Sequence, residues 1–111
     1  MEKAIIGIVE KVIIIGNKTK EVKAKIDTGS YNSSIDIGLA SELELGPIVK
    51  SKKIRSSHGI VTRPFVKGQV EIKGKIIDVL FHVADRNELR YPVLIGRKAL
   101  KKDFLIDPSR R

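Results

Sequence analysis

Short apolar or alternating runs, separated by glycine, proline and polar turns, fill almost the whole chain. Residues 12–15 form a continuous β-branched run. After the turn signal Gly16-Asn17, residues 21–26 alternate polar and apolar side chains. Alternation with period two indicates a half-buried strand, and a glycine-containing turn between two such runs predicts a hairpin. This first predicted hairpin leads directly to Asp27.

The rest of the pattern predicts further short strands and two short helices. Leucines four residues apart within residues 38–45 indicate one short helix, which Gly46-Pro47 ends, and residues 98–102 are expected to form one or two helical turns. Further strands are expected at residues 33–37, 50–55, 65–66, 69–72, 76–83, 91–97 (ended by Gly96) and 104–106. Short strands at such close spacing predict an all-β protein, a closed or folded-over barrel.

Two of these segments differ from an ordinary half-buried strand. The strand before Gly96 is apolar on both faces, so we expect it to lie centrally in the core. Residues 50–66 form a long hairpin that is mostly polar, with its tip at residues 56–59. A hairpin that can bury little of itself is expected to project from the body and to be mobile.

Length and composition narrow the class of protein. The 111 residues are expected to form a single domain, 1–111, and the apolar run near the N-terminus is too short to span a bilayer. We therefore expect a cytoplasmic protein with no membrane association. The sequence has no cysteine, which excludes a disulfide, a thiolate metal site and a thiol nucleophile.

Charge adds a hypothesis about partners. The net charge of +9 favours acidic partners, although a solvated lysine-rich surface explains it equally well. The five tyrosine and phenylalanine residues are spread along the chain instead of being interleaved with basic residues. This distribution disfavours nucleic acid as a partner, because stacking platforms for bases are not apparent.

A carboxylate at the end of the first hairpin is the strongest candidate for chemistry. In Asp27-Thr28-Gly29-Ser30, a half-buried aspartate would need hydrogen-bond donors. The Thr28 hydroxyl and the open backbone at Gly29 can supply them. The same tripeptide is also an ordinary turn sequence, so the motif alone leaves a catalytic and a structural interpretation open.

Two motifs in order resemble a subunit of a retropepsin-like aspartic protease. They are Asp27-Thr28-Gly29 and, after the projecting hairpin, Val93-Leu94-Ile95-Gly96-Arg97. The resemblance covers residues 20–109 and is closest to a microbial retropepsin-like family usually labelled ATP-dependent zinc proteases. Residues 55–59, 62–64, 85–86, 91–97 and 104–108 carry this closer resemblance. It implies the closed barrel of an acid protease subunit with one or two short helices.

This chain contains no sequence motif for binding the zinc or the ATP that the label names. The sequence contains neither a Gly-x-x-x-x-Gly-Lys-Ser/Thr phosphate loop nor a His-Glu-x-x-His zinc motif. We therefore expect no cofactor and no bound metal. His58 falls on the polar hairpin tip, and His82 is expected to be an accommodated strand residue and not a metal ligand.

The resemblance implies a homodimer that hydrolyses peptide bonds. The chain supplies only one Asp-Thr-Gly, so the second aspartate would come from an identical subunit across a two-fold axis. Two carboxylates about 3 Å apart share one proton, so one activates a water while the other protonates the scissile carbonyl oxygen. On this interpretation Asp27, Thr28 and Gly29 form the catalytic motif. Thr28 would bond across the interface, and Gly29 would leave room for the substrate backbone.

Other residues are expected to bind the substrate or to support the site. The flap, residues 56–63, would cover an extended peptide. The expected substrate-binding residues are Ser30, Arg55, Ser57, His58, Gly59 and Arg63. Arg55 and Arg63 flank the flap and could grip an acidic side chain or a carboxylate terminus, but ordinary exposed charges would explain them equally well. Gly96 is expected to pack closely beside the catalytic turn, and Arg97 to be a structural ion-pair partner.

The sequence and the resemblance also suggest a substrate and an alternative function. Some bacterial relatives are associated with ligases that add glutamates to proteins. Together with the net charge of +9, this suggests an acidic peptide or protein as the substrate. The alternative is a non-catalytic dimeric module that uses the same basic surface to bind acidic peptides or nucleic acid.

Overall fold

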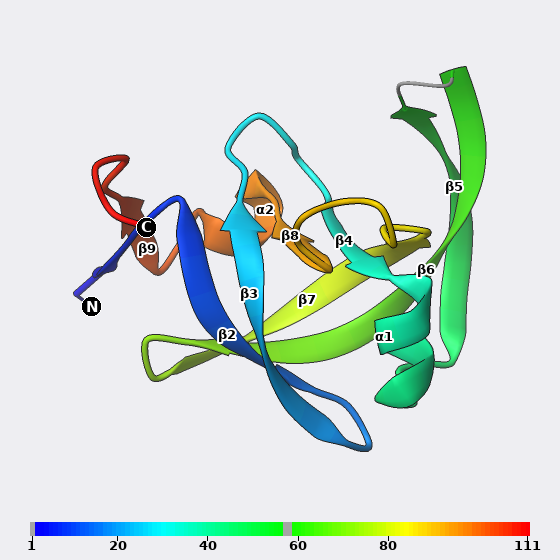
Figure 1. Ribbon diagram of the computed structural model, residues 1–111, viewed down its shortest axis with the longest axis horizontal. Coiled ribbons are helices and arrows are strands. Elements are labelled where there is room, and N and C mark those ends of the chain that lie inside the picture. The colour runs from blue at the N-terminus through cyan, green and yellow to red at the C-terminus, as the bar shows by residue number, and fades with distance from the viewer. Residues whose placement is uncertain (1, 57–58) are drawn as a thin grey trace.

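The strands expected from the apolar pattern close into one barrel in the computed structural model, which describes residues 2–56 and 59–111 (Figure 1). The barrel strands are β2 (Val9–Ile15), β3 (Thr19–Ile26), β4 (Ser33–Asp36), β6 (Gly59–Ile72), β7 (Lys75–Ala84) and β8 (Val93–Ile95). Their hydrogen-bonded order is β2-β3-β8-β4-β7-β6, and β6 pairs back with β2. The predicted all-β class and closed barrel are therefore confirmed.

The remaining elements lie outside this ring. Strand β5 (Ile48–Ser56) pairs with β6 at the edge of the sheet, while β1 (Ala4–Ile6) and β9 (Phe104–Ile106) form a separate parallel pair. The two helices are α1 (Ile37–Glu42) and α2 (Arg97–Leu100). Both predicted helices are present, but both end before their predicted last residues. Within the described part of the chain, neither helix has the length and apolar character to cross a membrane.

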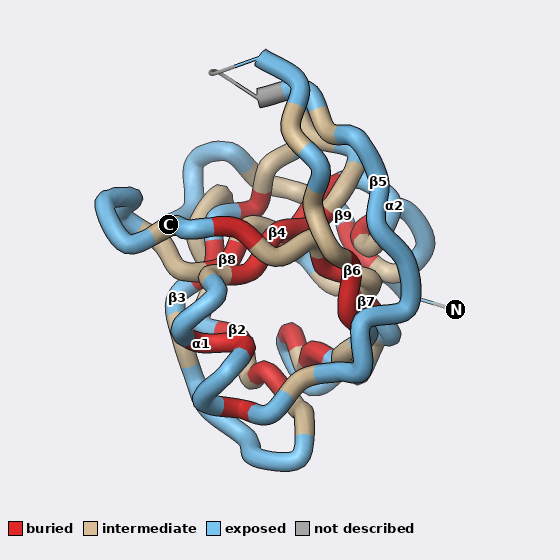
Figure 2. Tube along the Cα trace, turned by 90° about the vertical axis from the view of Figure 1, so that its right-hand side faces the viewer, coloured by how far each residue is buried: buried red, intermediate tan, exposed pale blue. Residues whose placement is uncertain are grey.

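The core fills the barrel from one face of each strand. In β3 the alternation places Ala24 and Ile26 inside and leaves Lys23 and Lys25 exposed, and Figure 2 shows the same red interior along the other barrel strands. Strand β8 runs between β3 and β4, with Val93 fully buried. The predicted central position of this apolar strand is confirmed, and it gives the residues next to β8 a rigid base.

Strand β6 differs from the prediction of two separate strands at residues 65–66 and 69–72. It runs unbroken for 14 residues, pairing with β5 in its first half and with β7 in its second. Gly68, which interrupts the apolar pattern, continues the strand. A Cβ there would make ordinary contact with the side chains of Leu45 and Phe81 at 3.4 Å, so packing does not require a glycine at this position. The β5–β6 hairpin projects from the barrel (Figure 1), and residues 57 and 58 of the predicted flap lie outside the described residues.

Candidate active site

Asp27 stands where two central strands end side by side. Strand β3 pairs in parallel with β8, with Ile26 opposite Ile95, and the Asp27 N–H donates to the Ile95 carbonyl at 2.9 Å. The Ser30 N–H then donates to the Asp27 carbonyl at 3.2 Å, which closes the turn. The aspartate is thereby fixed to the most buried part of the barrel.

The Asp27 carboxylate is held by its own turn. The Gly29 N–H donates to Oδ1 at 2.9 Å, and the Ser30 hydroxyl lies 3.4 Å from Oδ2. The Asp27 side chain is half-buried, whereas Thr28 is exposed. The local hydroxyl donor is therefore Ser30 in place of Thr28, and the bond of Thr28 across a subunit interface stays a prediction.

Gly96 allows two segments to run against each other behind this turn. A Cβ at Gly96 would lie 2.4 Å from the Asn32 carbonyl oxygen and 2.7 Å from that of Tyr31. The absence of a side chain lets the Gly96 N–H reach the buried Ser33 hydroxyl at 3.0 Å, and the Arg97 N–H reach the Ser30 carbonyl at 2.8 Å. The Asp27 turn therefore packs against the start of α2.

Arg97 supports the turn through a neutral acceptor. Its Nη1 donates to the Thr28 carbonyl at 2.8 Å, and its guanidinium carbon lies 5.8 Å from the centre of the Tyr31 ring. Across residues 2–56 and 59–111, Arg97 forms no ion pair. Within the described chain the acceptor of Arg97 is a backbone carbonyl, which fits the expected supporting position, and an ion pair of Arg97 stays a prediction.

Replacing Gly96 by alanine is expected to lower the free energy of unfolding by about 3 kcal/mol, because the new methyl group would collide with two backbone carbonyls that cannot turn aside. Gly68→Ala is the matched control, since its Cβ would meet only side-chain atoms at 3.4 Å. Urea denaturation of both variants measures the difference. A Gly96→Ala protein as stable as wild type would contradict the close packing described here.

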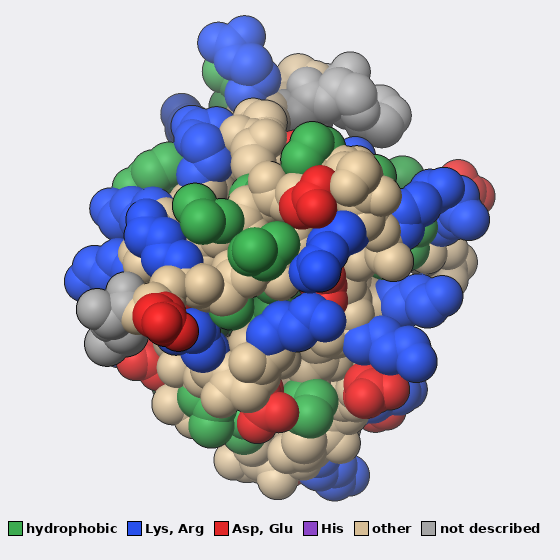
Figure 3. All heavy atoms as spheres, turned by 90° about the vertical axis from the view of Figure 1, so that its left-hand side faces the viewer, with side chains coloured by type: hydrophobic (Ala, Val, Ile, Leu, Met, Phe, Trp, Pro, Cys, Tyr) green, Lys and Arg blue, Asp and Glu red, His purple; other side chains and the backbone are tan. Residues whose placement is uncertain are grey.

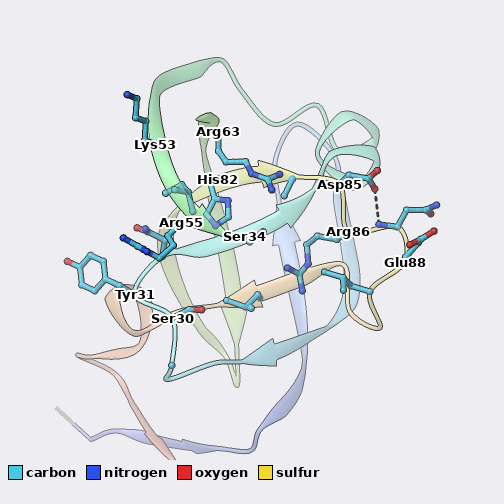
Figure 4. A pocket seen from close by; sticks show the side chains of 17 residues that line it. Ser30, Tyr31, Ser34, Lys53, Arg55, Arg63, His82, Asp85, Arg86 and Glu88 are labelled. Atoms are coloured by element: carbon cyan, nitrogen blue, oxygen red, sulfur yellow. Dashed lines mark hydrogen bonds between the residues drawn. The ribbon is translucent and has the colours of Figure 1, made fainter. Parts of the chain in front are cut away.

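An open cleft of about 810 Å³ adjoins the turn (Figure 4). It lies between the turn, the β5–β6 hairpin and the loop after β7. Of the residues expected in the site, Gly29, Ser30, Arg55 and Arg63 line it. Asp27, Thr28 and Gly59 are not among the lining residues, and Ser57 and His58 fall outside the described residues.

The cleft wall carries more positive than negative charge. Its cationic side chains are Lys53, Arg55, Arg63 and Arg86, against the two carboxylates of Asp85 and Glu88. Burial lowers the pKa of Arg86, and the carboxylates of Asp36 and Asp27 oppose this shift.

Ser34, His82 and Arg86 are among the cleft residues that were not expected from the sequence. Instead of being only an accommodated strand residue, His82 lines the cleft next to Ser34, its partner across β4 and β7. Burial and the charges of Arg63 and Arg86 lower the pKa of His82 from 6.5 to about 4, so the imidazole is neutral near pH 7. The sequence signal that could have pointed to His82 is that it is a single histidine inside an otherwise apolar run.

Asp36 anchors the loop that carries Arg86. Its Oδ2 accepts the N–H groups of Gly38 and Leu39 at the start of α1, and its Oδ1 accepts the Arg86 N–H at 2.8 Å. The Arg86 Nε in turn donates to the Tyr91 carbonyl at 3.0 Å. These bonds fix Arg86 at the cleft wall. In the part of the chain with described coordinates, no three histidine, cysteine, aspartate or glutamate residues are grouped as metal ligands.

Comparison with known families identifies one match. The RimB-like family, described as retropepsin-like aspartic endopeptidase RimB, matches residues 38–111. This description confirms the retropepsin-like resemblance. It does not support the zinc-protease label, because it names an aspartic endopeptidase.

One curated relative is a probable alpha-L-glutamate ligase from Shewanella halifaxensis. It is 27% identical over 113 residues, which cover 79% of this chain and 25% of that protein. The chain therefore spans about a quarter of the length of this relative.

Solved structures share the fold. A Legionella pneumophila protein of unknown function superposes with a TM-score of 0.70 at 22% identity, covering 96% of this chain and 94% of its own. The simian foamy virus protease superposes with a TM-score of 0.63 at 13% identity, covering 84% of this chain and 91% of its own. The EIAV protease in complex with the inhibitor HBY-793 superposes with a TM-score of 0.61 at 22% identity, covering 79% of this chain and 82% of its own. The predicted retropepsin-like fold is confirmed.

Proposed function

The chain belongs to the RimB-like family of retropepsin-like aspartic endopeptidases, and on this basis we propose that it is a homodimeric peptidase whose two Asp27 carboxylates hydrolyse a peptide bond. The observation that carries the proposal is the Asp27 turn, which is fixed to two central strands beside an open cleft. A carboxylate in that position can meet a second copy of itself across a two-fold axis.

The chemistry follows from two carboxylates that cannot both ionise at close range. They share one proton. The ionised carboxylate takes a proton from a water whose oxygen attacks the scissile carbonyl carbon, while the other gives its proton to the carbonyl oxygen. Collapse of the resulting diol breaks the C–N bond as a proton passes to the leaving nitrogen. The Gly29 N–H already bonded to Oδ1 holds the carboxylate in a fixed orientation throughout.

An acidic peptide is the proposed substrate. The cleft wall holds four cationic and two acidic side chains, and the whole chain carries a net charge of +9. The name of the Shewanella relative, a probable alpha-L-glutamate ligase, points in the same direction because its chemistry concerns glutamate. An extended peptide beside the β5–β6 hairpin would be held mainly through its backbone, so charge would provide the selection.

Glutamate-containing peptides are expected to be cleaved about tenfold faster in kcat/KM than their glutamine counterparts at low salt, because the positive cleft attracts the anion. The advantage should shrink as salt rises, since the screening length falls to about 10 Å at 0.1 M and about 3 Å at 1 M. Mass spectrometry of the products, with each glutamine peptide as the matched control, measures both effects. A salt-independent preference for apolar peptides would contradict an acidic substrate.

The alternative is a dimeric module that binds acidic peptides or nucleic acid without cleaving them. Its support is the same net charge of +9. On the face shown in Figure 3, lysine and arginine side chains are dispersed among acidic and apolar ones and do not form one continuous stripe. Duplex DNA that binds tightly and displaces peptides, with no cleavage detected, would favour this alternative.

A further inference from the structure

Three polar atoms in the cleft have no hydrogen-bond partner among the described residues. They are the Ser34 hydroxyl oxygen, Arg63 Nε and His82 Nδ1, and each is shielded from solvent. Leaving a buried polar group unpaired is unfavourable, and native proteins contain few such groups. The residues that carry all three line the same cleft. Three such atoms around one cleft indicate a missing ligand more readily than three separate defects.

The sheet register explains why they meet. Ser34 on β4 lies opposite His82 on β7, and His82 lies opposite Phe65 on β6. Arg63 is two residues before Phe65 on β6, so it lies on the same face of the sheet. The Phe65 and His82 rings lie 5.7 Å apart, which packs the imidazole from one side. Figure 4 shows Ser34, Arg63 and His82 coming from three neighbouring strands at one part of the cleft.

The chemistry of these groups selects an anionic acceptor. Arg63 Nε can only donate a hydrogen bond, a serine hydroxyl can donate, and a neutral imidazole carries one N–H. Within the described chain, no carboxylate lies within ion-pair distance of Arg63. Arg86 adds a second guanidinium from the loop after β7. A carboxylate offers two oxygens that can accept all of these donors and would neutralise part of the local charge.

We infer that Ser34, Arg63 and His82 form a subsite that binds one side-chain carboxylate of the substrate. The inference that the ligand is a peptide rests on the proposed peptidase function. The inference that the three residues bind a carboxylate does not depend on that function. The subsite belongs to one chain, so a two-fold dimer would present two of them. Such a dimer would select acidic residues on both sides of the cleaved bond.

The test uses the Asp27→Asn protein, which binds a peptide without cleaving it. The probes are an acetylated, amidated alanine hexapeptide with one central glutamate and the same peptide with glutamine. Calorimetry at 0.15 M salt is expected to show the glutamate peptide binding about tenfold more tightly, as one charge-assisted bidentate interaction would give. Adding Arg63→Met should abolish the difference. Adding Lys53→Met, which removes an equal charge from an exposed residue of the same cleft wall, should lower the difference less than Arg63→Met does.

A second readout follows His82 itself by NMR titration of its imidazole. The charged groups that face it are Arg63 from β6 and Arg86 from the loop after β7, and both disfavour its protonation. A bound carboxylate would offset them, so the pKa of His82 should rise from about 4 with the glutamate peptide and stay in place with glutamine. Should Arg63→Met fail to fold, Ser34→Ala serves as the second variant, with an expected few-fold loss for the glutamate peptide alone.

The outcomes separate the subsite from the peptidase. Equal affinities for the two peptides, or equal losses from Arg63→Met and Lys53→Met, would overturn the subsite, because only the general field of the cleft would then be acting. Glutamate-selective binding that depends on Arg63 would support it even if the wild-type protein cleaves nothing. Cleavage by wild type without any glutamate preference would leave the peptidase and remove the subsite.

Discussion

Replacing Asp27 by asparagine is expected to lower kcat by about 10³-fold or more, while the fold and the dimer are retained. Asparagine keeps the shape of aspartate and an oxygen that can accept the Gly29 N–H. It cannot take a proton from water or share one with the partner carboxylate. The loss should therefore be confined to the chemical step, and initial rates on a cleavable peptide measure it.

Asp78→Asn is the matched control for this substitution. Asp78 is an exposed aspartate on β7 whose carboxylate accepts a bond from the Gln69 side chain at 3.1 Å, and it is absent from the cleft wall. Its rate should equal that of wild type. Thermal unfolding and sedimentation of both variants check that fold and association are unchanged. Hydrolysis by Asp27→Asn near the wild-type rate would exclude Asp27 as the catalytic group.

The Asp27 turn is the part of the structure that the sequence predicts best. The alternation in β3 is local, and it places Asp27 at the end of that strand without reference to any distant residue. The apolar run in β8 likewise predicts its own burial. Signals of this kind need only the side-chain period and the turn residues, and both can be read along the chain.

The wall of the cleft could not be predicted in the same way. Ser34, Arg63 and His82 are separated by tens of residues and meet only through the register of β4, β6 and β7. A shift of one residue in that register would move His82 to the opposite face. The local pattern fixes neither the register nor the face that borders the cleft, so the histidine could be interpreted only as part of a strand.

Long-range pairing also explains the differences in β6 and at Arg97. Glycine usually weakens a strand, but at residue 68 the pairing of β6 with β7 overrides that preference. At Arg97 the motif indicates a supporting role. The acceptor is the Thr28 carbonyl, whose position depends on the folded turn.

Activity is expected to depend on the dimer population, because one chain supplies one Asp-Thr-Gly and the proposed site needs two carboxylates. Mixing wild type with a ninefold excess of Asp27→Asn chains, under conditions of subunit exchange, should lower the activity per wild-type chain to about a tenth. Most wild-type chains would then sit in heterodimers with a single catalytic aspartate. An equal excess of Asp78→Asn chains should leave the activity per chain unchanged.

The most direct measurement is specific activity over a dilution series, with analytical ultracentrifugation of the same samples. If two Asp27 carboxylates form the site, specific activity should fall in proportion to the dimer fraction as the protein is diluted below its dimer dissociation constant. Full specific activity in samples that sediment as monomer would contradict the two-carboxylate mechanism.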